Sequence, residues 1–166
     1  MPDIGGYMGY EIVLLPAMIV MGPELRTTWM NQECYSAIPN FWQQQRTENN
    51  IQKIPHKTYS DVIVGLYTNY SSDFSLTSGY YSLIIGGPVS SVDAIPQGMV
   101  VKEIPAGKYA VFTAKGPFHP AIAKVWIEEI WQNKELERTF TNDFEWYDSN
   151  STDDENSVVK IYIAIK

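Results

Sequence analysis

The sequence predicts an α+β fold made of two similar halves, and two observations lead to that prediction. Apolar segments of strand length alternate with one helical segment per half, in the order strand, helix, strand, polar turn, strand. The bends also look alike, because Pro16-Ala17-Met18 in the first half corresponds to Pro105-Ala106-Gly107 in the second. A plan that recurs in this way indicates a duplicated βαββ module. We therefore expect antiparallel sheets with one main helix per half.

The first half extends from residue 11 to about residue 94. Residues 1–10 are rich in glycine and lack a periodic pattern, which predicts a flexible lead segment before a single domain over residues 11–166. Residues 11–28 are apolar but are interrupted by Pro16 and Pro23, so we expect one long kinked strand or two short strands. The other elements of this half are a helix and two strands, over residues 37–49, 61–70 and 80–89.

The second half extends from about residue 95 to residue 166. Residues 99–104 and 109–115 are predicted to pair as a hairpin around the Pro105-Ala106-Gly107 turn. The best helical pattern in the chain follows over residues 120–134, where apolar residues recur at three- and four-residue spacing. The last elements are two strands joined by an acidic turn, over residues 143–148 and 158–166.

The bulk properties argue against several classes of function. A formal net charge of −7 disfavours direct nucleic-acid binding, because phosphate contacts need a basic surface. With one cysteine and two histidines outside any metal-binding motif, we expect no disulfide, no metal and no other cofactor. The sequence also shows neither a signal peptide nor the ~18 uninterrupted apolar residues of a membrane span. A cytoplasmic location without membrane contact is therefore expected.

Side-chain alternation sorts the last two strands between the two faces of the sheet. We expect one face to pack under the second helix through Phe144, Trp146, Ile161, Ile163 and Ile165. The opposite, open face then gathers a carboxylate and two phenols: Glu145, Tyr147 and Tyr162. A partly buried carboxylate needs a partner, and a cation among aromatic rings gains about 0.5–2 kcal/mol per ring. The alternative is that Glu145 is a solvated residue on an exposed face.

Several segments together resemble a known family. They are VGLYTNY (64–70), YSLIIG (81–86), IPAGKYAVFTAKGPF (104–118), AKVWIEEIW (123–131), TNDFEWYD (141–148) and VKIYIAI (159–165). In this order and spacing they resemble the GyrI-like small-molecule-binding domain, the effector-binding domain of AraC-type and MerR-type transcription regulators. The resemblance covers the whole expected domain. It implies a pseudo-twofold axis between the two βαββ halves and a central ligand cleft between them.

The resemblance also implies a function and its residues. Members of the family place an acidic residue of the penultimate strand in an aromatic pocket that receives hydrophobic, cationic small molecules, and the matching residue is Glu145. Tyr162 matches a pocket position on the last strand. Tyr67 and Tyr147 are included in the predicted site only because their side chains are expected on the same face of the sheet. The regulators carry a helix-turn-helix domain for which there is no room before Glu11. We therefore expect a stand-alone sensing module that sequesters or reports its ligand, or that acts on a regulatory protein partner.

Three other functions stay open at the level of the sequence. Some GyrI-like proteins resemble hydrolases of electrophilic small molecules, and the same carboxylate could activate water there. The haem-binding SOUL proteins are similar in fold, and the axial ligand would then be His56 or His119. A protein-interaction domain that uses the open sheet is the third alternative.

Overall fold

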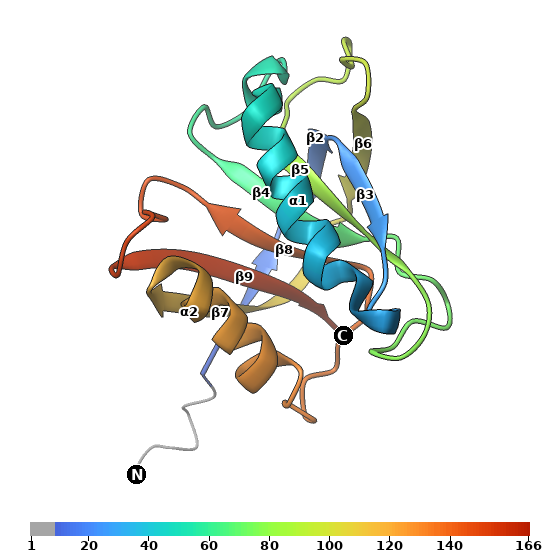
Figure 1. Ribbon diagram of the computed structural model, residues 1–166, viewed down its shortest axis with the longest axis vertical. Coiled ribbons are helices and arrows are strands. Elements are labelled where there is room, and N and C mark those ends of the chain that lie inside the picture. The colour runs from blue at the N-terminus through green and yellow to red at the C-terminus, as the bar shows by residue number, and fades with distance from the viewer. Residues whose placement is uncertain (1–8) are drawn as a thin grey trace.

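The computed structural model of the chain describes residues 9–166 (Figure 1). The lead segment expected over residues 1–10 lies, as far as Met8, outside these described residues. The rest forms one antiparallel sheet of nine strands with two main helices, an α+β fold. The strands are β1 (Glu11–Leu15), β2 (Met18–Gly22), β3 (Glu24–Thr27), β4 (Ile63–Thr68), β5 (Tyr81–Pro88), β6 (Val100–Ile104), β7 (Gly107–Gly116), β8 (Asn142–Tyr147) and β9 (Ser157–Ile165).

The first helix, α1 (Glu33–Glu48), begins four residues before the predicted helix of residues 37–49. Pro39 lies inside it, and a short 3₁₀ turn, η2 (Met30–Gln32), leads into it. Asn49 ends the helix in the left-handed region with φ of 58°, a conformation that asparagine tolerates, and its N–H bonds to the carbonyls of the last turn. A second 3₁₀ turn, η3 (Asn50–Lys53), follows.

The second helix has two parts, α2 (Phe118–Lys124) and the π-helical η4 (Val125–Ile130). It ends at Ile130, earlier than the predicted helix of residues 120–134. Its wider last turns are closed by a bond from the Trp131 N–H to the Trp126 carbonyl. Neither this helix nor any other within residues 9–166 combines the length and hydropathy needed to cross a membrane.

The predicted pairing of residues 99–104 with residues 109–115 is wrong. β6 pairs with β2 and β7 pairs with β1, in one continuous antiparallel register in which Leu15 faces Gly107 and Met18 faces Ile104. Pro16 and Pro105 fall inside the bends of these two long, bent segments. Because proline has no N–H to give to a ladder, both segments bend there together instead of folding back as hairpins. The residues expected as one or two strands over 11–28 accordingly form three: β1, β2 and β3.

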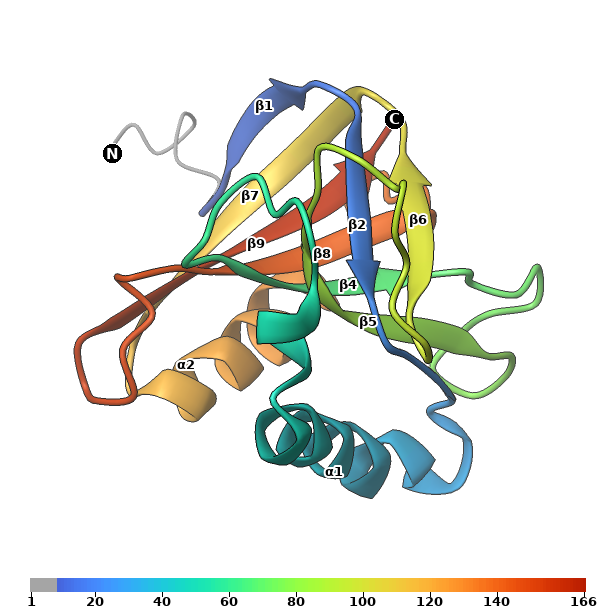
Figure 2. The same cartoon turned by 90° about the horizontal axis from the view of Figure 1, so that it is seen from above.

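The strand order β1-β7-β9-β8-β4-β5-β2-β6, with β3 also on β5, joins the two parts of the sheet through β4 and β8. Both helices cover the same face of this sheet (Figure 2). We call this the helix face and the opposite one the open face. The core lies on both: Phe112, Ile161 and Ile163 pack beneath the second helix, while Leu66 and Phe144 are buried on the open face.

The close approach of β2 to β5 depends on glycine. A Cβ atom at Gly86 would overlap the backbone carbonyl of Met21, which cannot move without disturbing β2. We predict that Gly86→Ala lowers the free energy of unfolding by about 1–3 kcal/mol, the usual cost of overpacking. Gly107→Ala is the control, because nothing lies within 4 Å of its Cβ position, and its effect should stay within about 0.5 kcal/mol. Urea unfolding of the two variants checks the prediction. Equal losses of stability for Gly86→Ala and Gly107→Ala would show that the close approach of β2 to β5 does not require glycine.

Candidate functional site

A cavity of about 560 Å³ lies on the helix face between the two helices. α1 contributes Cys34, Tyr35, Ile38 and Pro39, and the second helix contributes Ala123, Trp126 and Ile127. The strands and loops below add the aromatic residues Trp29, Tyr67, Tyr70, Phe74, Tyr81 and Trp131 together with Arg138. A volume of this size, walled mainly by rings, is typical of a small-molecule site.

The carboxylate of Glu145 lies beneath the floor of this cavity. It is 3% exposed and accepts hydrogen bonds from three neutral donors. Trp126 Nε1 donates to Oε2 at 2.7 Å, Tyr67 OH lies 3.5 Å from the same oxygen, and Tyr147 OH donates to Oε1. Tyr67 and Trp126 also line the cavity, so they connect the buried charge to the space above it.

Glu145 has no cationic partner among the described residues, where Arg138 and Asp143 form the only ion pair. Burial therefore raises the pKa of the Glu145 carboxyl, although the hydrogen bonds from Tyr147, Trp126 and Tyr67 oppose the shift. Burial, and the neighbouring negative charge, also raise the pKa values of Tyr67 and Tyr147, so both stay protonated donors. In its ionised form, the Glu145 carboxylate is thus stabilised by neutral groups alone.

A second buried carboxylate beside the cavity has a cationic partner. Asp143, two residues before Glu145 and on the same face, pairs with Arg138 at 2.9 Å and accepts a hydrogen bond from Tyr70 OH at 2.6 Å. The guanidinium also lies over the Phe140 and Trp131 rings, with its carbon 4.3 and 4.6 Å from their centroids. The cavity wall therefore includes a cation that is already neutralised.

The structure brings three of the four predicted site residues together and separates the fourth. Glu145, Tyr67 and Tyr147 meet on the helix face, whereas Tyr162 lies on the open face beside a different cavity. The predicted facing of residues 143–148 is wrong: Phe144 and Trp146 point to the open face, and Glu145 points toward the helices. Directly paired residues of a sheet share a face, and the register pairs Glu145 with Ile161 and Phe144 with Tyr162.

Neither Trp126 nor Arg138 was expected in the site from the sequence. Trp126 lies on the apolar stripe of its helix, and that stripe faces the sheet. Its indole N–H therefore needs an acceptor on the sheet, and it donates to the Glu145 carboxylate. The side chain of Arg138 is 6% exposed although it follows the helix in a polar loop, where no periodic pattern indicates burial.

The two histidines lie away from both cavities. His56 and His119 are exposed and line neither of them. Within residues 9–166, no group of three or more His, Cys, Asp or Glu side chains is arranged to hold a metal ion.

The chain is similar to known proteins over nearly all of its described length. Residues 11–165 match the family described as integron-associated effector binding protein. YobU of Bacillus subtilis, which is named as a transcriptional regulator protein, is 34% identical over 131 residues, or 78% of this chain and 79% of YobU.

Two solved structures share the fold. An integron cassette protein from the mobile metagenome of Vibrio cholerae has a TM-score of 0.73 and 28% identity, and the match covers 95% of this chain and 96% of that protein. A protein solved with bound tetraphenylphosphonium has a TM-score of 0.80 at 22% identity, and the match covers 96% of this chain and 94% of that one. At 22% identity, the similarity to the tetraphenylphosphonium-bound protein establishes a shared fold and nothing more.

The raised pKa of Glu145 makes folding stability depend on pH. Because the folded state holds this proton more tightly than the unfolded chain does, stability increases as pH falls through the raised pKa, and the gain is complete below the unfolded value. Glu145→Gln lacks this contribution. We therefore predict that the stability of Glu145→Gln relative to the parent decreases as the pH is lowered from neutral toward about 4, the ordinary pKa of a glutamate carboxyl. Thermal unfolding of both proteins across this range checks it, and a pH-independent difference would contradict it.

Proposed function

The chain belongs to the family of integron-associated effector-binding proteins, and we propose that it binds hydrophobic, cationic small molecules between α1 and the second helix. In this proposal it is a stand-alone sensing module. Glu145 supplies the negative charge, and the rings of Tyr67, Trp126 and their neighbours form the walls. Tyr147 holds the carboxylate from the other side, while Tyr162 has no part in this site.

The observation that carries the proposal is the buried carboxylate without a cationic partner. A charge removed from water is unfavourable unless it is paired, and the three neutral donors on Glu145 compensate it only in part, as the raised pKa indicates. Asp143 nearby has a guanidinium and needs nothing more. A cation in the cavity would supply the missing charge for Glu145.

The cavity walls favour the same class of ligand. Trp29, Tyr35, Phe74, Trp131 and Tyr81 surround the space with aromatic faces and edges, and each ring within reach of a cation adds about 0.5–2 kcal/mol of attraction. Such walls also stabilise the apolar substituents of a lipophilic cation. The neighbour with bound tetraphenylphosphonium, an ion of this kind, has the same fold and supports the proposal.

Relatives named as transcriptional regulators support a sensing role. The formal net charge of −7 makes direct contact with nucleic acid unfavourable. We infer that ligand binding is instead reported to a regulatory protein partner, and that the chain acts as a single domain over residues 11–166.

We also infer that the domain is a duplication with a pseudo-twofold axis between β4 and β8. Exchanging β1 with β6, β2 with β7, β4 with β8 and β5 with β9 reverses the strand order into itself. The correspondence of the bends at Pro16 and Pro105 supports the same axis, with halves of residues 11–94 and 95–166.

A hydrolytic role for Glu145 has less support than a binding role. A general base must reach the attacking water, yet this carboxylate is 3% exposed and protein donors occupy both of its oxygens. Such an arrangement favours a fixed countercharge over a group that exchanges protons with substrate.

We predict that Glu145→Gln weakens binding of tetraphenylphosphonium at least about tenfold, because the buried countercharge is lost while its shape is kept. Binding of triphenylphosphine oxide, an uncharged analogue of similar shape, should change by less than about twofold. Isothermal titration of both ligands at fixed salt checks the prediction.

The matched control is Glu128→Gln, which removes the same charge from an exposed position of the second helix. It should leave the affinity for tetraphenylphosphonium within about twofold, since exposed charges are screened. If both variants lost affinity equally, only the net charge of the protein would matter, and the anchor role of Glu145 would be rejected.

A further inference from the structure

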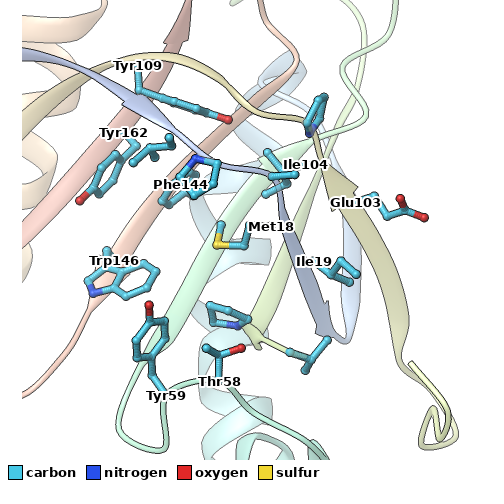
Figure 3. A pocket seen from close by; sticks show the side chains of 16 residues that line it. Met18, Ile19, Thr58, Tyr59, Glu103, Ile104, Tyr109, Phe144, Trp146 and Tyr162 are labelled. Atoms are coloured by element: carbon cyan, nitrogen blue, oxygen red, sulfur yellow. The ribbon is translucent and has the colours of Figure 1, made fainter. Parts of the chain in front are cut away.

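The open face carries a second cavity, of about 700 Å³, that the proposed cation site does not use (Figure 3). It lies on the inner side of the bend that β1–β2 and β6–β7 make at Pro16 and Pro105, and the sheet forms its other wall. The sheet itself separates it from the helix-face cavity. Its volume is within the range of about 300–1,000 Å³ that small-molecule sites occupy.

Aromatic rings form much of the wall that the sheet provides. Phe144 and Tyr162 are stacked, with ring centroids 4.6 Å apart and 12° between their planes. Tyr59, from the loop before β4, meets Trp146 edge to face at 5.5 Å and is 49% exposed. Figure 3 shows Tyr59 and Trp146 at one end of the cavity and Tyr109 at the other. Rings on this scale favour a flat aromatic ligand.

Charged side chains are nearly absent from the lining. Among the described residues, the one side chain bordering the cavity that is charged at neutral pH is Glu103, and Figure 3 shows its carboxylate directed away from the other lining side chains. An ion in this space would lose hydration and find no countercharge among the side chains that face it. The occupant that fits is therefore uncharged.

One polar group at the lining, the Tyr109 hydroxyl, is free to bond an occupant. Tyr109 is 3% exposed, and its hydroxyl makes no hydrogen bond to any residue in the described part of the chain. The hydroxyls of Tyr67, Tyr70 and Tyr147 on the helix face, in contrast, all bond to carboxylates. A phenol hydroxyl that borders a cavity and has no protein partner can bond a ligand, so Tyr109 offers a donor to whatever fills the cavity.

We propose that this open-face cavity is a second ligand site, which takes an uncharged, flat aromatic molecule carrying a hydrogen-bond acceptor such as a ketone. The rings of Phe144, Trp146 and Tyr59 contact the flat body of the molecule, and the Tyr109 hydroxyl donates to the acceptor. The site is independent of Glu145, because the sheet lies between them and the lining does not include Glu145.

The test uses 6-propionyl-2-dimethylaminonaphthalene, an uncharged naphthalene ketone whose emission shifts to the blue in apolar surroundings, and 2-dimethylaminonaphthalene, which lacks the ketone. The parent protein should bind the ketone saturably with a blue shift. Tyr109→Phe should lower the affinity for the ketone about three- to tenfold, the effect of one hydrogen bond. Its affinity for the ketone-free probe should be unchanged.

Two alanines at the rims of the two cavities provide matched controls. Ala17 borders the open-face cavity and Ala123 borders the helix-face cavity, and both are exposed. Ala17→Phe should lower the affinity for both naphthalene probes. Ala123→Phe should leave those affinities unchanged and lower the affinity for tetraphenylphosphonium instead. Thermal unfolding of each variant separates lost binding from lost folding.

Three results would overturn the proposal. The first is the absence of saturable ketone binding to the parent protein. The second is equal affinity of the parent and Tyr109→Phe for the ketone. The third is displacement of the ketone by tetraphenylphosphonium, which would place both ligands in one cavity. None of these results bears on the effect of Glu145→Gln on cation binding, so the two proposals fail separately.

Discussion

The antiparallel pairing of β4 with β8 is the contact on which the rest of the structure depends. It joins the two parts of the sheet, and its register places Gly65 opposite Glu145 and Val64 opposite Trp146. Because paired residues share a face, Glu145 lies beneath the helices while Trp146 points to the open face. A slip of one residue would exchange the two faces, and the carboxylate would leave its phenols and indole. The site is therefore a consequence of strand register.

The two acidic residues of β8 on the helix face show how differently one fold can treat equal charges. Asp143 is neutralised by Arg138 and bonded by Tyr70 and by the Ala164 N–H, a set of partners that fixes the end of the sheet. Glu145 has only neutral donors, and burial raises its pKa. The first arrangement stabilises the fold. The second leaves charge uncompensated beside a cavity, which is typical of residues kept for binding.

The bends at Pro16 and Pro105 give the open face its own concavity. Since the two long segments bend together, they curve over the central strands of the sheet and enclose a space that Phe144, Trp146 and Tyr162 line from the other side. Alternate residues of β8 thus serve opposite cavities: Glu145 belongs to a charged one and Phe144 to an uncharged one. One strand can supply two chemically distinct surfaces because its side chains alternate.

The sequence by itself determined the α+β class and the order of helices and strands, and it singled out Glu145 as a candidate, because local periodicity, prolines and family resemblance all act within short segments. It also placed Tyr67 and Tyr147 with that carboxylate. Only the tertiary structure decided which face they occupy, that Tyr162 lies elsewhere, and that Trp126 and Arg138 belong to the site. Alternation defines two faces without saying which one meets a helix, and only pairing between distant strands settles that question. The same limit explains why the predicted β6–β7 hairpin was wrong. No local pattern distinguishes a hairpin from two bent segments that pair with each other, as β1–β2 and β6–β7 do.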